Sequence, residues 1–496
     1  MAEHTLYSIS QFLPEIIIVA TLCVIIVADL FDKNEKSSSG WILLVGFAAA
    51  GMAILFQIGR NESVFYDMIA VDPFAVFFKI LLVITGLFIV AFSMKSRELD
   101  AYKSRMGEYY MLLSGMMLGM MLMVGSANLL LMYLALEITS ISSYVLVGFT
   151  KRSLRSAEAS MKYIIYGAVS SGVMLYGLSL LIGITGATDI YSVNSALAAG
   201  VDQPLILNIA LLMILVGLGF KIAIVPFHFW APDVYEGAPI TITALLAVAS
   251  KLAAFAIIIR FFKVSFTDNS GLTDYGLWTL FEGLNWNLLL AGMAVLAMIL
   301  GNLTALKQDN IKRMLAYSSI SHAGYLLMGL VILTEQGIST ILIYLFIYIF
   351  MTLGAFYVAM LFSNKVSTES IEAYKGLGRR APLQGVAMTI FLVSLTGLPP
   401  TGGFIAKLYI FGAAINAGWI WLVAIAGIMT VVSLFYYIRV VRNLFFFEPS
   451  DDEDELVFST MSKVILLILL IPTLLLGVYF SPLIEFAGKS IQMFGM

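Results

Sequence analysis

Residues 217–232 read GLGFKIAIVPFHFWAP, an apolar stretch that contains Lys221 and is interrupted by Pro226. Proline lacks a backbone donor and clashes with the preceding turn, so a helix that meets Pro226 must end or bend there. Inside a bilayer the freed backbone groups need protein or water as partners, because lipid offers none. The stretch therefore predicts a discontinuous membrane helix with a lysine beside its break.

A second interrupted stretch, residues 395–407, reads LTGLPPTGGFIAK and ends on Lys407. The two lysines lie 186 residues apart, which is close to the separation of two other apolar runs, 128–149 and 311–333. The members of each pair lie five expected spans apart, and an odd offset turns the second copy upside down in the membrane. This pattern is typical of inverted-repeat transporters, whose sites lie near the bilayer midplane.

The composition is that of a protein embedded in a membrane, with 60% hydrophobic residues, 12% charged residues and a mean hydropathy of +0.96. An average soluble domain carries roughly 25% charged residues. A crossing helix needs about 20 apolar residues, and such runs predict an all-α polytopic membrane protein with about fourteen transmembrane helices. The expected spans are 11–30, 41–58, 72–93, 109–125, 128–149, 161–185, 205–225, 239–262, 286–305, 311–333, 337–362, 384–416, 419–441 and 462–486. The first run is long enough to remain as a span, and no cleavable signal peptide is expected.

The spans divide the chain into four parts. Residues 1–108 are expected to hold three N-terminal helices, and residues 109–262 a first repeat of five helices. Residues 286–441 are expected to form a second, inverted repeat of five helices with its own discontinuous helix. Residues 442–496 supply a cytoplasmic loop and the last helix. The acidic run Asp451–Glu455 falls in that loop and is expected to be solvated, with contact to a partner subunit as the alternative.

Basic residues indicate the orientation of the spans. Eighteen Lys and Arg fall in loops on one side of the expected bundle, and four fall on the other, namely Arg60, Arg260, Lys263 and Lys489. Cytoplasmic loops of membrane proteins carry the excess of positive charge. Both termini are therefore expected on the non-cytoplasmic side of a multi-pass protein of the cell's inner membrane.

Four ionisable residues, Glu137, Lys221, Lys251 and Lys407, lie within apolar runs. A charged side chain at the bilayer centre costs ~2.5–3.5 kcal/mol on insertion scales, so a chain that keeps several of them is expected to use them. An amine withdrawn from water loses its proton more readily than one in solution, whereas a guanidinium keeps its proton. Each residue is therefore a candidate for a proton relay. The alternative for each is a structural polar group satisfied by a neighbouring helix or a helix end.

Three further residues are candidates for the same relay. Lys162 begins a span, and the alternative is that its side chain reaches the membrane interface. His228 follows the first break and His322 lies in the expected tenth span, and for each the alternative is a packing or capping role. Lys79 and Lys463 are expected to act as anchors at the membrane interface.

No catalytic, cofactor-binding or metal-binding residue is expected in this chain. Cys23 is the only cysteine, so the chain forms no internal disulfide and holds no iron–sulfur cluster alone. The three histidines, His4, His228 and His322, lack metal-ligand spacing, and no Gly-rich nucleotide loop occurs. Any redox chemistry is expected to belong to partner subunits.

Several segments resemble a known family. They are EASMKYIIYGAVSSG at 158–172, GFKIAIVPFHFWAPDVYEGAP at 219–239 and NIKRMLAYSSISHAG at 310–324, with the regions around Glu137, Lys251 and Lys407. The chain is similar to the antiporter-like membrane subunits of proton-pumping NADH:quinone oxidoreductase, respiratory complex I. That family also includes the large subunits of multisubunit sodium/proton antiporters, and the resemblance covers nearly all of the chain. Within the family, Lys407 and the short segment after the last span resemble one of the three large subunits of complex I.

The resemblance implies a role for each candidate. Glu137 and Lys221 would be an interacting acid–lysine pair, Lys251 the central relay and Lys407 the group on the exit side. The chain would be a non-redox, proton-translocating subunit coupled to electron transfer elsewhere, with FMN, iron–sulfur clusters and quinone in partner subunits. Its partners would be neighbouring antiporter-like and small membrane subunits and the lipid bilayer, with no nucleic acid. The alternative is a subunit of a multisubunit Na⁺/H⁺ antiporter, which shares these channel residues.

Overall fold

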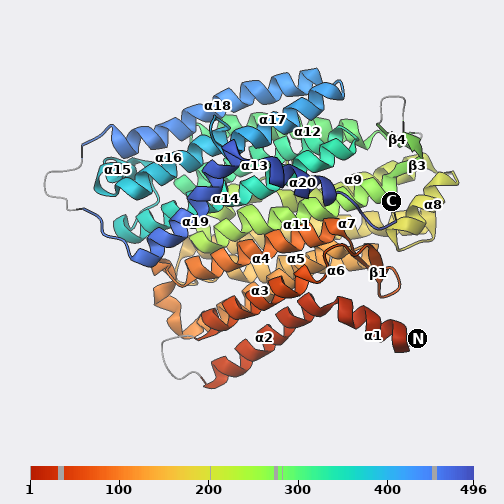
Figure 1. Cartoon of the computed structure of the whole chain (residues 1–496), viewed down its shortest axis with the longest axis horizontal. Coiled ribbons are helices and arrows are strands. Elements are labelled where there is room, and N and C mark those ends of the chain that lie inside the picture. The colour runs from red at the N-terminus through yellow and green to blue at the C-terminus, as the bar shows by residue number, and fades with distance from the viewer. Residues whose placement is uncertain are drawn as a thin grey trace.

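The computed structural model describes residues 2–31, 38–200, 203–272, 277–281, 283–448 and 455–495. Its long helices run side by side and form one elongated bundle (Figure 1). The strands in this part of the chain form two small antiparallel hairpins, β1 (Glu62–Val64) with β2 (Ile69–Val71) and β3 (Thr267–Leu272) with β4 (Trp278–Leu280). The predicted all-helical class is confirmed. Most of the acidic run expected in the last loop, residues 451–454, lies outside the described residues.

The N-terminal helices lie along one edge of the bundle, in red and orange in Figure 1. They are α1 (Ala2–Gln11), α2 (Leu13–Phe31), α3 (Ser39–Leu55), α4 (Pro73–Ser93) and the 3-10 helix η1 (Arg97–Arg105). α2 and α3 pack on each other, and α4 joins this edge to the helices of the interior.

Two successive groups of helices form the body of the bundle. The first comprises α5 (Met106–Gly125), α6 (Leu129–Val147), α7 (Leu154–Thr185), α8 (Ile190–Ala198), α9 (Pro204–Ile222), α10 (Trp230–Gly237) and α11 (Ile240–Phe266). The second comprises α12 (Trp286–Ala305), α13 (Ile311–Val331), α14 (Glu335–Val366), the 3-10 helix η2 (Ile371–Tyr374), α15 (Leu377–Arg380), α16 (Pro382–Thr396), α17 (Gly402–Asn416) and α18 (Ile420–Phe445). The chain ends with α19 (Thr460–Val478) and α20 (Ser481–Lys489), which pack across α14.

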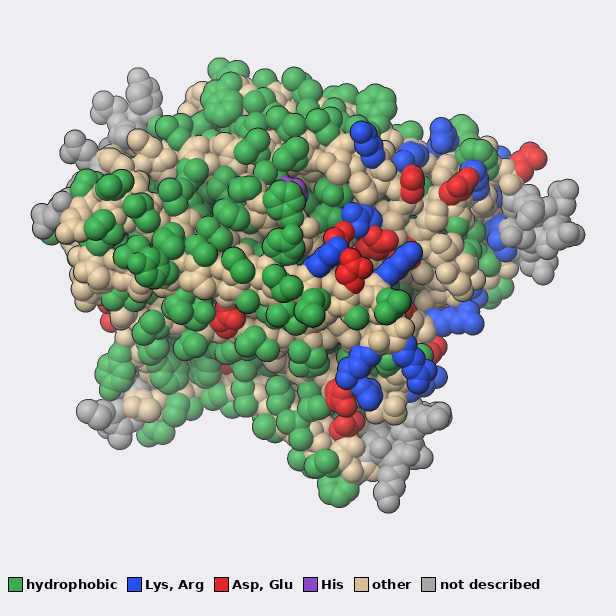
Figure 2. All heavy atoms as spheres, turned by 180° about the vertical axis from the view of Figure 1, so that it is seen from behind, with side chains coloured by type: hydrophobic (Ala, Val, Ile, Leu, Met, Phe, Trp, Pro, Cys, Tyr) green, Lys and Arg blue, Asp and Glu red, His purple; other side chains and the backbone are tan. Residues whose placement is uncertain are grey.

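Three helices form the interior of the bundle. All of the most apolar part of α11 is buried inside the protein, as is 94% of the corresponding part of α13 and of α14. A helix that is hydrophobic all round belongs in such an interior. In α2, α18 and α19 only 28% is buried, and their outer faces expose apolar side chains suited to lipid. Figure 2 shows hydrophobic side chains over most of one flank, with charged side chains gathered toward one end.

Twelve helices of the described chain are long and apolar enough to cross a membrane. The other two expected spans coincide with shorter apolar helices, one with α3 and the other with the pair α16 and α17. The count of about fourteen spans therefore stays a prediction.

Both predicted interruptions are present in the structure. α9 ends at Ile222 and α10 begins at Trp230, so the segment around Pro226 is non-helical. The second interruption separates α16 from α17, and Gly397 takes a positive φ of 89° at the end of α16. A Cβ atom at position 397 would lie only 2.7 Å from Cδ of Lys407, so the glycine leaves room for the lysine side chain.

The structure corrects the placement of three basic residues. Arg260 and Lys263 were expected in a loop, but both lie on α11 and are buried. Arg260 pairs with Asp72 through two hydrogen bonds of 2.7 and 2.8 Å, and neither side chain is exposed. Lys79 is buried rather than interfacial, and its Nζ lies 2.7 Å from Oε1 of Glu15. Charge pairing between helices, which local hydropathy does not encode, explains Arg260 and Lys79, whereas Nζ of Lys263 lies 4.8 Å from the centre of the Trp278 ring.

Candidate functional site: a file of buried lysines

Lys221 occupies the last turn of α9, immediately before the first break. Its side chain is 2% exposed, and Nζ donates to Oγ of Ser140 on α6 at 3.1 Å. Glu137 lies one turn earlier on α6, is half-buried, and interacts electrostatically with Lys221. Oε1 of Glu137 is buried without a hydrogen-bond partner in the described part of the chain, and no ion pair within 4.0 Å joins the two residues there. The acid and the lysine are thus neighbours, with Ser140 as the direct contact of the lysine.

Lys251 lies near the middle of α11 and is 1% exposed. Its Nζ donates to both the carbonyl and the hydroxyl of Ser319 on α13. The hydroxyl of Tyr348, on α14, donates to Oγ of the same serine at 3.1 Å. Ser319 therefore joins three helices at the amine of Lys251. A buried polar group needs such partners, since leaving it unpaired costs about 1–3 kcal/mol.

His322 lies one turn beyond Ser319 on α13 and is buried. Its Nδ1 is 2.7 Å from the hydroxyl of Tyr344. The imidazole lies within electrostatic range of both Lys251 and Lys407. An imidazole has a proton donor and an acceptor on opposite nitrogens, so it is chemically able to pass a proton from one side to the other.

Lys407 lies on α17, just after the second break, and is 4% exposed. Its Nζ donates to the carbonyl of Thr396 at 2.7 Å and to Oγ1 of Thr430 at 3.3 Å, and it stands 4.5 Å from the centre of the Tyr325 ring. Thr396 is the last residue of α16, and carbonyls at a helix C-terminus lack partners within the helix and attract cations. The break therefore supplies the acceptor that holds this amine.

Two of the weaker candidates lie apart from this file. Lys162 is 38% exposed and forms ion pairs of 2.7 Å with Glu158 and 2.6 Å with Asp233. Asp233 also pairs with Arg313, so these residues form a charged cluster on the flank of the bundle. His228 stacks beside Phe229, and its Nδ1 has no hydrogen-bond partner among the described residues. The structure brings neither residue into contact with the buried lysines.

Sequence reasoning missed the side chains around the amines and His322. The hydroxyls of Ser140, Ser319 and Thr430 accept from the amines, the Tyr325 ring lies under Lys407, Tyr344 contacts His322 and Tyr348 contacts Ser319. A partial signal existed, because Tyr344 and Tyr348 lie four residues apart on one face of a helix. No group of three or more His, Cys, Asp or Glu in the described ranges is placed to hold a metal ion.

Comparison with known proteins assigns the family. Residues 126–433 match the model of the family described as NADH:quinone oxidoreductase/Mrp antiporter, TM. The chain is 43% identical over 492 residues to NADH-quinone oxidoreductase subunit N 2 of Chloroherpeton thalassium, covering 98% of this chain and 95% of the relative. It is 40% identical over 504 residues to NADH-quinone oxidoreductase subunit N of Chlorobium chlorochromatii, covering 99% and 96%.

Solved structures agree with this assignment. The fold matches a chain of respiratory complex I from Thermus thermophilus with a TM-score of 0.79 and 30% identity, over 96% of this chain and 99% of that chain. A chain of the Mrp complex from Dietzia sp. matches with a TM-score of 0.80 and 19% identity, over 97% of each chain, which shows a shared fold. The resemblance noted in the sequence is confirmed. The chain belongs to the antiporter-like family of NADH:quinone oxidoreductase membrane subunits, and within that family to the subunit N group.

Proposed function

We propose that this chain is the proton-translocating N subunit of an NADH:quinone oxidoreductase and that protons cross it through Glu137, Lys221, Lys251 and Lys407. The observation that carries the proposal is the set of buried amines held by hydroxyls and carbonyls, without an ion-pair partner within 4.0 Å among the described residues. Ionisable groups buried within a membrane protein are by default candidates for a proton path. Full-length identity of about 40% to subunits N supports the coupling to a redox enzyme.

The contacts suggest an order of transfer. A change of charge at the edge of the subunit would alter the interaction of Glu137 with Lys221. The amine of Lys221 would then release or recapture its proton. The proton would pass to Lys251, which is held by Ser319, and then by way of His322 to Lys407. Each transfer forms one N–H or O–H bond and breaks another. Lys162 and His228 remain outside this order because they have other contacts.

The proposed assembly places the redox chemistry elsewhere. FMN, iron–sulfur clusters and quinone would be held by partner subunits, as electron transfer in those subunits drives this one. The partners in the membrane would be neighbouring antiporter-like and small subunits, together with lipid.

The inverted repeats at 109–262 and 286–441 belong to the same proposal. Paired helices have similar lengths, since α7 and α14 each contain 32 residues and α5 and α12 each contain 20. Each unit also has one interrupted helix with a lysine at the break. An asparagine caps the second helix of each unit, Asn128 before α6 and Asn310 before α13. Fourteen spans with both termini outside the cytoplasm fit this arrangement, as do the N-terminal helices of 1–108 and the last loop and helix of 442–496.

Substitution of Lys221 by alanine tests the relay. In membranes where assembly of the complex is verified, NADH-driven proton uptake should fall steeply while the complex remains intact. Unchanged pumping and turnover would defeat the proposal. The exposed residue Lys375, which pairs with Glu372 on the surface, offers a control, and its alanine variant should pump normally.

A sodium/proton antiporter subunit is the second candidate, and the shared fold with the Mrp chain favours keeping it. The two functions differ in their partners. Co-purification with flavin and iron–sulfur subunits supports the redox enzyme, whereas co-purification with small antiporter subunits supports the antiporter.

A further inference from the structure

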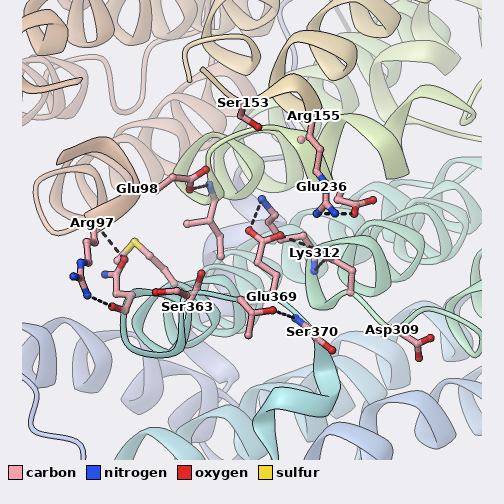
Figure 3. A pocket seen from close by; sticks show the side chains of 17 residues that line it. Arg97, Glu98, Ser153, Arg155, Glu236, Asp309, Lys312, Ser363, Glu369 and Ser370 are labelled. Carbon is pink, nitrogen blue, oxygen red and sulfur yellow. Dashed lines mark hydrogen bonds and ion pairs between the residues drawn. The ribbon is translucent and has the colours of Figure 1, made fainter. Parts of the chain in front are cut away.

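A polar cavity opens where the two groups of helices meet at the end of the bundle that carries the basic loops. Its volume is about 730 Å³, enough for roughly twenty water molecules at ~30 Å³ each. Its lining comes from η1, the start of α7, the junction of α10 and α11, the start of α13 and the end of α14. Figure 3 shows charged side chains from these segments pointing toward one another around it.

Four carboxylates line this cavity, and three of them are ion-paired. Glu369 lies 2.6 Å from Nζ of Lys312, Glu236 pairs with Arg313 and Arg155, and Asp309 pairs with Arg439. Glu98 is the fourth, and within the described ranges it has no cation within 4.0 Å. A carboxylate that is not committed to an ion pair is the one best able to exchange a proton.

Glu98 also contacts the N-terminus of α11, the helix that carries Lys251. Its Oε2 accepts a hydrogen bond of 3.1 Å from the backbone N–H of Ile240, the first residue of α11 (Figure 3). Lys251 lies eleven residues further along α11, which corresponds to about 16 Å at 1.5 Å per residue. The alternative is a purely structural role, in which Glu98 only caps the N-terminus of α11. That role needs an acceptor oxygen and no exchangeable proton.

A line of side chains on α14 leads from the cavity toward Lys251. Met360 lines the cavity, Thr352 lies about two turns before it on α14, and Tyr348 lies one turn before Thr352 on the same helix face. The hydroxyl of Thr352 is buried close to Tyr348, but the two are not within ordinary hydrogen-bond geometry, and no other described residue accepts from it or donates to it. A buried polar atom without a partner is rare and marks a place that water or a passing proton would satisfy. Beyond it, the hydroxyl of Tyr348 contacts Ser319, which holds Lys251.

We propose that this cavity is the mouth through which protons reach Lys251 from the side of the basic loops, and that Glu98 takes them up. The inference rests on the proton-relay function proposed above, to which it adds a direct entry of protons at Lys251 beside the transfer from Lys221. A proton from bulk solvent adds to the carboxylate of Glu98, leaves it for water in the cavity, and passes by way of the hydroxyls of Thr352, Tyr348 and Ser319 to the amine of Lys251. Each hydroxyl accepts one proton and donates another, so only O–H and N–H bonds change.

Two substitutions at Glu98 separate proton uptake from helix capping. Glu98→Gln keeps an oxygen to accept from Ile240 but cannot take up a proton, whereas Glu98→Asp keeps the carboxyl group. In inverted membrane vesicles that contain the assembled complex, Glu98→Gln should lower NADH-driven proton uptake about tenfold. Glu98→Asp should retain most of the uptake, and a small weak acid such as formate should partly restore a Glu98→Ala variant, because the cavity admits it.

A matched control uses Glu448, an exposed carboxylate outside the cavity that lies 4.0 Å from Arg379. Glu448→Gln should pump at the wild-type rate. The inference is overturned if the Glu98→Gln complex takes up protons at the wild-type rate. It is also overturned if Glu98→Gln fails to assemble, because that result would show a structural role. The Lys251→Ala variant separates a failure of the proposed mouth from a failure of the proton relay. If that variant also pumps normally, the relay itself is wrong; if it is inactive while Glu98→Gln is normal, only the proposed mouth is wrong.

Discussion

The buried pair of Asp72 and Arg260 allows the most quantitative prediction. Asp72 accepts two hydrogen bonds from Arg260, of 2.7 and 2.8 Å, and both side chains are inaccessible to solvent. The same carboxylate caps α4 by accepting from the N–H of Ala75 at 2.7 Å, and it accepts from the N–H of Phe494 at 3.0 Å. One side chain thus joins α4, α11 and the C-terminal segment. Asp72→Ala would leave a buried guanidinium without its partner.

The expected loss of stability follows from these contacts. Removing one partner of a buried ion pair costs about 3–5 kcal/mol, and losing a helix cap adds about 1 kcal/mol. We therefore expect Asp72→Ala to lower the free energy of unfolding by about 4–6 kcal/mol. The double variant Asp72→Ala with Arg260→Met removes the stranded charge and should regain most of this loss, because an apolar replacement of a buried pair is often neutral.

The assay is a denaturant titration of the purified complex in lipid nanodiscs, with dissociation and unfolding of this subunit followed on native gels. Glu62→Ala serves as the control, since Glu62 forms a solvent-accessible ion pair of 3.4 Å with Arg60. Such a surface pair contributes about 0–1 kcal/mol. The reasoning fails if Asp72→Ala is as stable as the wild type, or if the double variant is no more stable than Asp72→Ala alone.

Two further predictions concern the interrupted helices. Lys221→Arg keeps a positive charge near Ser140 but holds its proton, so proton uptake by the assembled complex should fall on the order of tenfold or more; normal uptake would show that this amine need not titrate. Gly403→Ala would place a methyl group 1.7 Å from the carbonyl oxygen of Ser394, so we expect a loss of about 1–3 kcal/mol in the same titration. Gly412→Ala on the same helix meets no atom within 4 Å and is the matched control, and an equal effect of the two would contradict the steric explanation.

Much of the candidate site could be predicted from sequence because its signals are local. An amine within an apolar run, such as Lys251, is visible wherever hydropathy is measured over a helix length. Pro226 and the stretch around Gly397 indicated helix breaks for reasons of backbone sterics alone. Each of these features needs only the residues on either side of it.

Contacts between distant segments could not be predicted in this way. Ser319 lies 68 residues from Lys251, and nothing in its own neighbourhood distinguishes it from the serines beside it. Lys79 looked like an interfacial anchor, yet the packing of α2 on the N-terminal edge gives it Glu15 as a buried partner. Lys162 looked equally able to join the relay, but its ion pairs hold it in another cluster.

The sequence by itself determined the membrane class, the helical content, the two interruptions and the buried amines, because apolar run length and proline act over one helix at a time. Tertiary structure alone decided which hydroxyl or carboxylate lies near each amine, and which carboxylate of the polar cavity has no ion pair with a described residue. Those outcomes depend on how helices pack around α11, α13 and α14, where side chains from remote parts of the chain must satisfy every buried charge.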